Sequence, residues 1–335
     1  MHTRISKANL LAPCIGLVVC MTIILFCADN AKSALQILFT GAFSSAYYFG
    51  TFLNVAAFLI TAGTGSAIAL KSGNMNLGGE GQIYAGGFFA CLILTGVKGN
   101  PILVFLLACT VSILSGACLS LISACLKEAK GASVLLTSFL VSAATIPLID
   151  SAITNSKQGP SQNLLALPYI PEAFRFKSIL PPSPLTGTLF IALALSACTA
   201  YIMFKTNAGK KLTIWGLAPS FAEYSGFSKA ANSFASLAVS GALHSLTGLF
   251  AVCGTYFTCH KGFYSGMGWN ALTVALVAGA NPLYIILSAL VLSWLYTSAD
   301  IVSLTQGFSF DIGGIVQGVV LFTIALSVLK RGESR

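Results

Sequence analysis

Lys71-Ser72-Gly73-Asn74-Met75-Asn76-Leu77-Gly78-Gly79-Glu80-Gly81-Gln82 interrupts two long apolar runs, and the fold is interpreted from this stretch outward. Only 8% of the 335 residues are charged, so a glutamate between apolar runs is costly and has a purpose. Irregular backbone at membrane depth persists only where it is buried in protein or lines a watery cavity. The stretch therefore indicates either a helix break beside a solute path or a polar turn at the cytoplasmic rim. Spacing alone does not choose between them.

Composition excludes a soluble domain, because 56% of the residues are hydrophobic and several apolar runs approach the roughly 18 residues of a membrane-spanning helix. The net charge of +9 comes from basic residues in short loops, which indicates topology rather than binding of nucleic acid. Most of the ten cysteines lie in apolar runs, and no Cys-x-x-Cys occurs, so no zinc or redox site is expected. A disulfide between Cys253 and Cys259 stays open as an alternative.

The apolar pattern predicts an all-α polytopic membrane protein in which residues 1–335 form one transmembrane domain of about ten spans. The predicted spans are 10–27, 52–70, 83–97, 101–126, 133–149, 184–204, 234–252, 269–280, 283–296 and 312–329. A proline-rich segment, 153–184, is expected outside, and a polar loop, 205–229, in the cytoplasm. The third and eighth helices are short, so either one could be re-entrant.

Basic residues predict the orientation. An even number of spans puts both termini on one side, and placing them inside assigns twelve of the eighteen lysines and arginines to the cytoplasm. The other six are Lys32, Lys98, Lys157, Arg175, Lys177 and Lys261. This excess predicts N-in and C-in.

The chain also shows a weak internal symmetry. In each set of five predicted spans the third is short and follows a glycine-bearing interruption, Gly73–Gly81 in one half and Gly262–Gly268 in the other. Five spans per half invert the second half relative to the first. Paired interruptions in inverted halves predict a transport path near the axis between them, by analogy with secondary transporters.

Enzymatic motifs are missing from the sequence. Gly209-Lys210-Lys211-Leu212 lacks the upstream glycine and the following Ser or Thr of a phosphate-binding loop. No His-Glu-x-x-His or Gly-x-Ser-x-Gly occurs. His244, inside a predicted span, either faces the path or bonds a neighbouring helix, and the second is favoured. We expect no enzyme and no metal or cofactor on this chain.

The cytoplasmic loop 205–229 contains signals for a short helix. Pro219 suits a first helical turn and Gly226 suits a helix end. Phe221 and Tyr224 are three residues apart and share one face. A soluble subunit could bind to such a helix. The alternative interpretation is an amphipathic loop that lies on the membrane.

Three motifs resemble the permeases of ATP-binding-cassette (ABC) importers, in the group that serves branched-chain amino acids, simple sugars and nucleosides. The first is Gly73-x-x-Asn76-Leu77-Gly78-x-Glu80-Gly81-Gln82. The second runs from Thr206 through Gly209, Leu212, Gly216, Pro219, Ala222, Tyr224 and Gly226 to Ser240-Gly241-Ala242-Leu243. The third is Gly268–Pro282, and together they extend over residues 40–330. The first motif is similar to the nucleoside type, which riboflavin permeases also resemble.

The resemblance implies alternating access driven by a separate ATPase that uses the ATP. Its other implied partners are a second permease subunit and an extracytoplasmic binding protein, in the lipid bilayer of a bacterial inner membrane. The expected path residues are Asn76, Glu80, Gln82, Trp269 and Asn270, and the expected ATPase-coupling residues are Gly209, Gly216, Pro219, Phe221, Tyr224 and Gly226.

Several alternatives remain. Glu80 could equally meet the N-terminal dipole of the third helix. Ala218 and Asn270 depart from the family pattern, which leaves the solute open between a nucleoside, a flavin and a simple sugar. The rival classes are an ion-coupled transporter, disfavoured because Asp150, Asp300 and Asp311 lie near helix ends, and a structural membrane protein.

Overall fold

The computed structural model describes residues 7–156, 164–308 and 310–332, which form an all-helical fold. Six of the described helices are long and apolar enough to cross a membrane: α3 (Ala46–Lys71), α5 (Pro101–Lys130), α6 (Val134–Thr154), α7 (Thr188–Lys205), α10 with its π-helical extension (Lys229–Tyr256) and α12 (Pro282–Gln306). The other helices are α1 (Lys7–Cys27), α2 (Ala31–Thr40), α4 (Gly79–Gly96), α8 (Asn207–Leu217), α9 (Pro219–Tyr224), α11 (Met267–Val277) and α13 (Ile312–Gly332).

Burial separates central helices from peripheral ones. In α3 and α10, 83% and 78% of the most apolar 18 residues are buried, against 28% in α5 and 22% in α6. The outer helices present large apolar side chains, among them Leu103, Leu106 and Leu140, which are more than half exposed. A helix that is apolar all round is buried in protein or faces lipid, so α3 and α10 form the centre and α5 and α6 the rim.

The helices pack in a reciprocal pattern. Helix α10 packs on α4 and α5, and α3 packs on α11 and α12, while α3 and α10 pack on each other. Helices α5 and α12, which hold equivalent places in this pattern, have matching ends as well. Helix α5 has Asn100 as N-cap, Pro101 in its first turn and a left-handed Gly131 at its end; α12 has Asn281, Pro282 and a left-handed Gly307 in the same places.

Close backbone contact between α5 and α10 depends on small side chains. A Cβ added to Gly116 would collide with the carbonyl oxygen of Gly241, and a Cβ added to Gly241 would collide with that of Gly116. Small residues at such crossings let membrane helices approach and pack without a hydrophobic driving force. Helix α10 is thereby locked against the half of the molecule that carries α4, α5 and α6.

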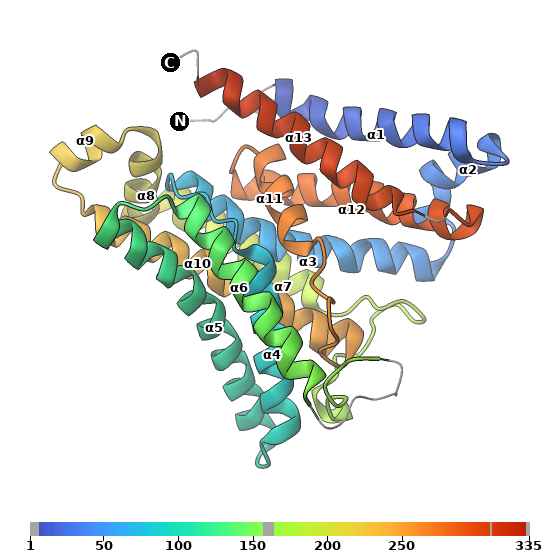
Figure 1. Cartoon of the computed structure of the whole chain (residues 1–335), viewed down its shortest axis with the longest axis horizontal. Coiled ribbons are helices and arrows are strands. Elements are labelled where there is room, and N and C mark those ends of the chain that lie inside the picture. The colour runs from blue at the N-terminus through green and yellow to red at the C-terminus, as the bar shows by residue number, and fades with distance from the viewer. Residues whose placement is uncertain (1–6, 157–163, 309, 333–335) are drawn as a thin grey trace.

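Two ends of the molecule can be distinguished in Figure 1. Helix α1 begins and α13 ends at the end that also carries α8 and α9, whereas α2 and the turn between α12 and α13 lie at the opposite end. The predicted cytoplasmic loop, 205–229, contains two helices, α8 and α9. The predicted external segment has a short 3₁₀ turn, Glu172–Phe174, and two isolated β-bridges among its described residues.

Several predicted boundaries shift. Helix α12 continues ten residues beyond the predicted end at Tyr296, to Gln306, and α7 begins at Thr188 rather than at Pro184. Helix α11 has 11 residues, a length of about 17 Å against the ~30 Å of a bilayer core. The expectation that the eighth helix is short therefore holds. Cys253 and Cys259 are both buried free thiols, so the alternative of a disulfide between them is wrong.

Candidate functional site

The first glycine-rich break, residues 72–78, joins α3 to α4 by a turn that needs glycine. Gly73 has φ of +79°, in the left-handed region where other residues are strained. The Asn74 N–H donates to the Ala69 carbonyl (2.9 Å), which closes the end of α3. The chain then runs without regular structure to Gly78 and re-enters a helix at Gly79. The polar stretch is therefore a helix break inside the protein.

A buried polar network fixes this break. Asn76 Nδ2 donates to Gln82 Oε1 (3.1 Å) and to Ser240 Oγ (3.0 Å), and Gln82 Nε2 donates to Asn76 Oδ1 (3.2 Å). His244 Nδ1 lies 2.7 Å from Gln82 Oε1, and its Nε2 lies 3.0 Å from Ser66 Oγ. All are buried, and the expectation that His244 bonds neighbouring helices is confirmed. Of the predicted path residues, Asn76 and Gln82 thus lie inside a hydrogen-bonded core.

Two serines of α6 hold the break from the other side. Ser138 Oγ accepts from the Leu77 N–H (2.9 Å) and Ser142 Oγ accepts from the Gly81 N–H (2.8 Å). They satisfy one backbone donor just before α4 and one in its first turn, where N–H groups have no partner within the helix. This pair was not predicted, although two serines four residues apart on an apolar helix were a usable signal.

The second break meets the first directly. Helix α10 passes into the π-helical turn Val252–Tyr256, and an irregular segment then leads to α11. Glu80 Oε1 accepts a hydrogen bond from the Gly266 N–H (2.8 Å). A Cβ on Gly268 would collide with the backbone of Glu80. Two interruptions that lie 186 residues apart in the sequence are therefore in contact.

The remaining predicted path residues gather at this contact. Trp269 and Asn270 lie in the first turn of α11, and the Trp269 ring lies 6.4 Å from that of Phe139 on α6. Asn270 Oδ1 is buried and has no hydrogen-bond partner. Glu80, Trp269 and Asn270 are all partly exposed, unlike Asn76 and Gln82.

A second carboxylate lies on the same side. The buried Tyr84 donates to Asp150 Oδ1 (2.7 Å), and its ring lies 4.5 Å from that of Tyr264. Asp150 and Tyr264 are partly exposed and were not predicted as site residues. Helices α4 and α6 and the second break thus bring carboxylates and aromatic rings to one region.

The coupling region has the predicted local structure. Pro219 lies in the first turn of α9, and Gly226 follows the helix with φ of +75°. Phe221 is 60% exposed and Tyr224 is 92% exposed, so their shared face is free.

Two further glycines of the predicted coupling set lie at tight contacts. A Cβ on Gly209 would collide with the Ile202 carbonyl, and one on Gly216 with the Lys71 carbonyl, beside Gly73. Helix α8 therefore rests directly on the first break.

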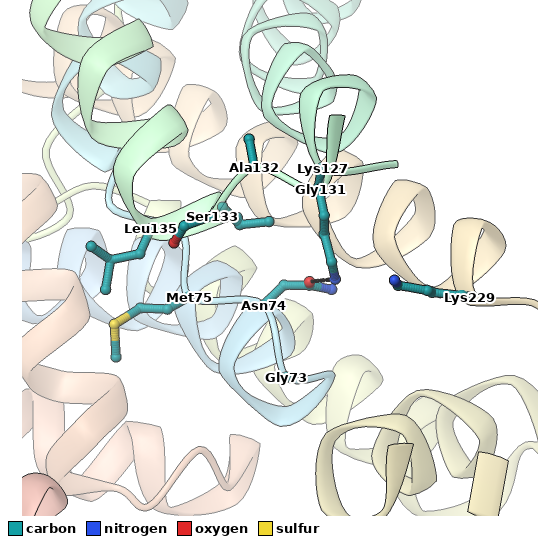
Figure 2. A pocket seen from close by; sticks show the side chains of 10 residues that line it. Gly73, Asn74, Met75, Lys127, Gly131, Ala132, Ser133, Leu135 and Lys229 are labelled. Atoms are coloured by element: carbon teal, nitrogen blue, oxygen red, sulfur yellow. Dashed lines mark hydrogen bonds between the residues drawn. The ribbon is translucent and has the colours of Figure 1, made fainter. Parts of the chain in front are cut away.

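A basic pocket of about 390 Å³ opens beside the break at the same end (Figure 2). Lys127 Nζ donates to Asn74 Oδ1 (2.6 Å) and to Ser233 Oγ (3.0 Å), and Lys229 points toward them from α10. The hydrogen bonds of Lys127 beside this pocket link α5 to the first break and to α10. Among the described residues, no group of three or more His, Cys, Asp and Glu could hold a metal ion.

The arrangement of helices is similar to that of a solved chain. A chain of PsaBC from Streptococcus pneumoniae, determined in complex with Fab, has a TM-score of 0.50 and 17% identity, and the match covers 88% of this chain and 95% of that one. This similarity concerns the fold alone.

Sequence comparison shows the family. A family described as branched-chain amino acid transport system / permease component matches residues 48–325, and the chain belongs to this family. It is 32% identical to the probable riboflavin import permease protein RfuC of Treponema pallidum, over 97% of this chain and 88% of that one. It is 24% identical to the guanosine ABC transporter permease protein NupP of Bacillus subtilis, over 96% and 93%. It is 25% identical to the glucose ABC transporter permease protein TsgB13 of Haloferax volcanii, over 89% and 81%.

The chain is therefore a permease subunit of an ABC importer, a multi-pass membrane protein and a non-catalytic transport subunit. A permease of this kind works with an ATPase and a solute-binding protein.

Proposed function

We propose that this permease passes a nucleoside-like or riboflavin-like solute across a bacterial cytoplasmic membrane by alternating access. The observation that carries the proposal is the contact between the two breaks through Glu80 and Gly266. Broken helices that meet within a membrane domain are the usual place of a solute site. The relatives named for riboflavin and guanosine support the solute class.

In this proposal the partly exposed residues at the contact line the path. Trp269 and Tyr264 offer aromatic faces to a planar ring, and the buried Asn270 Oδ1, which has no partner in this state, becomes an acceptor if the path opens beside it. Asn76 and Gln82 do not line the path themselves. Their hydrogen bonds to Ser240 and His244 hold the first break against α10. Glu80 joins the two breaks.

The topology proposed is ten helices in two inverted halves, with both termini inside. Counting α4, α11 and the terminal helices with the six long spans gives this number, and the short α11 then crosses together with the irregular segment that precedes it. The reciprocal packing and the matched ends of α5 and α12 support inverted halves. The shared end of α1, α13, α8 and α9 supports the orientation.

In this proposal an ATPase binds to α8 and α9, with Phe221 and Tyr224 in the contact, and drives the change between the outward-open and inward-open states of the permease. ATP binds to that partner and no cofactor binds to this chain. The apolar rim is available to lipid and to a second permease subunit, identical or homologous, and an extracytoplasmic binding protein delivers the solute. Nucleotide binding shifts a two-state equilibrium, because the ATPase dimer fits one permease state better than the other.

Uptake by proteoliposomes tests the proposal. Vesicles that contain the permease, its ATPase and its binding protein are expected to accumulate labelled riboflavin or guanosine only when ATP is present. Accumulation of glucose alone would favour the sugar alternative, which the Haloferax relative supports. Uptake without the ATPase would contradict the mechanism.

A further inference from the structure

The basic pocket beside the first break shares no residue with the proposed solute path. Its volume of about 390 Å³ lies within the roughly 300–1,000 Å³ of small-molecule sites. The wall is built from the first break, the last turn of α5, the start of α6 and the start of α10. Figure 2 shows the Lys229 side chain pointing toward that of Lys127. Among the described residues that line the pocket, none is acidic.

The two lysines leave positive charge at this pocket without full compensation. Lys127 Nζ donates to Asn74 and to Ser233. Ser233 Oγ donates in turn to Glu128 Oε1 (2.8 Å), so one carboxylate partly compensates this lysine. Lys229 is exposed, and among the described residues its Nζ has neither a hydrogen bond nor a salt bridge. The two ammonium groups repel each other, and an anion beside both replaces this repulsion with two attractions.

The start of α6 adds a further attraction for an anion. Ser133 is the N-cap residue of this 21-residue helix, but its side chain makes no capping hydrogen bond. Val134 and Leu135, in the first turn, line the pocket, and the N–H groups of a first turn have no partner within their helix. The positive end of the helix dipole therefore lies at the pocket, where it favours phosphate and other anions.

The chemistry of the wall defines the class of ligand. Two ammonium groups and a helix N-terminus together are groups that bind phosphate oxygens. A ligand can reach both lysines, because Lys229 is exposed and Lys127 is partly exposed. The volume has room for more than a phosphate ion, and Met75, Val134 and Leu135 make another part of the wall apolar. The ligand that fits is thus a phosphate group with an organic part attached.

We infer that this pocket binds the phosphate group of a phosphate ester, either a soluble monoester or the head group of an anionic phospholipid. The inference goes beyond the transported solute and does not depend on which solute is carried. A bound phosphate ties the start of α6 to Lys127 on α5 and to Lys229 on α10. Because Ser138 and Ser142 of the same helix hold the first break, the ligand stabilises the state of the permease in which α6 contacts that break.

Binding to the whole permease in nanodiscs, which are open on both faces, tests the inference in two arms. In the first arm the lipid is zwitterionic phosphatidylcholine alone. Inorganic phosphate, riboflavin 5′-phosphate and guanosine 5′-monophosphate are titrated by calorimetry, with riboflavin and guanosine as the probes that lack phosphate. Low salt limits screening of the charges. In the second arm no soluble phosphate is present, and thermal unfolding is compared between discs with and without phosphatidylglycerol.

The decisive variant is Lys229→Gln, which removes an exposed charge and no hydrogen bond within the described part of the chain. Lys229→Arg keeps the charge. The matched control is Lys210→Gln, since Lys210 is also an exposed lysine, lies on α8 at the same end of the molecule, and does not line the pocket.

The inference predicts that a phosphate probe binds more tightly than its parent compound in the first arm, or that phosphatidylglycerol raises the unfolding midpoint in the second. The first result assigns the site to a soluble ester and the second to a lipid head group. Lys229→Gln is expected to weaken soluble binding about tenfold or more, or to abolish the lipid effect, because a charge-assisted hydrogen bond is lost. Lys229→Arg and Lys210→Gln are expected to retain the effect. No effect in either arm, or an effect that Lys229→Gln leaves intact or that Lys210→Gln weakens equally, overturns the site.

Discussion

At the scale of the residue, Glu80 has a specific structural task. Its Oε1 accepts the Gly266 N–H, and this bond joins the two breaks. A glutamine keeps the oxygen and loses the charge, whereas an alanine loses both. We expect Glu80→Gln to retain ATP-driven uptake within a few-fold and Glu80→Ala to lose about tenfold or more, because an unpaired N–H costs about 1–3 kcal/mol. Equal loss in both variants would show that the charge itself is required.

His244 is the second residue with a defined effect. His244→Leu leaves Ser66 without its partner and removes one bond to Gln82. We expect a loss of about 1–3 kcal/mol in the free energy of unfolding, measured by thermal unfolding in detergent. Thr110→Ala is the control, because that exposed hydroxyl bonds only the Leu106 carbonyl of its own helix. An unchanged midpoint for His244→Leu would refute the role of the network.

At the scale of the element, the crossing of α5 and α10 is tight enough for one methyl group to matter. Gly116→Ala drives a Cβ into Gly241 and Ser245, and overpacking of this kind costs about 1–3 kcal/mol. Gly318→Ala, in α13 with nothing within 4 Å of the new Cβ, should instead gain about 0.5–1 kcal/mol, since alanine is the better helix former. Thermal unfolding of the two variants side by side measures the difference. Similar midpoints would contradict the packing argument.

Helix α9 gives the test of ATPase docking. Phe221→Asp and Tyr224→Asp together place two charges on an exposed face without disturbing the core. We expect the purified ATPase to be captured by the wild-type permease and lost by the double variant, because an apolar contact is replaced by desolvated charge. Tyr47→Asp, in the first turn of α3, which begins at the opposite end in Figure 1, should still capture it. Capture by the double variant would place the contact elsewhere.

How far the sequence predicted each element depends on whether its signal was local. Hydropathy located most spans, because lipid-facing helices carry their apolar character in every turn. It ended α12 too early at Tyr296, because Thr297 and Ser298 lower the local hydropathy although both are buried in protein. The caps at Pro219 and Gly226 are local signals, and they were predicted correctly.

Long-range arrangement was beyond the sequence analysis. The glycine pattern suggested two related breaks, but the hydrogen bond from Gly266 to Glu80 joins residues 186 positions apart and depends on tertiary packing. For the same reason Asn76 and Gln82 could not be distinguished from partly exposed neighbours, since all are polar residues near glycines. Asp150 was interpreted only as a residue near a helix end, and its bond to Tyr84 was not foreseen.

At the scale of the whole molecule, the proposed orientation can be measured. In a cysteine-free background, Ser225→Cys and Asn155→Cys each place one exposed thiol on opposite sides of the proposed membrane plane. An impermeant maleimide added to intact cells is expected to label Asn155→Cys and to spare Ser225→Cys until the cells are opened. Labelling of Ser225→Cys from outside would invert the proposed topology.

The contact of Gly216 with Lys71 and Gly73 has one more consequence for the molecule. Main chain touches main chain there, with no flexible side chain between the two segments to yield under load. A displacement of α8 is therefore transmitted directly to the end of α3, because no side chain between them can change its rotamer to absorb it. A larger residue at Gly216 would separate α8 from α3. The variant would then transmit less of the α8 displacement to α3, while its affinity for the ATPase stayed the same.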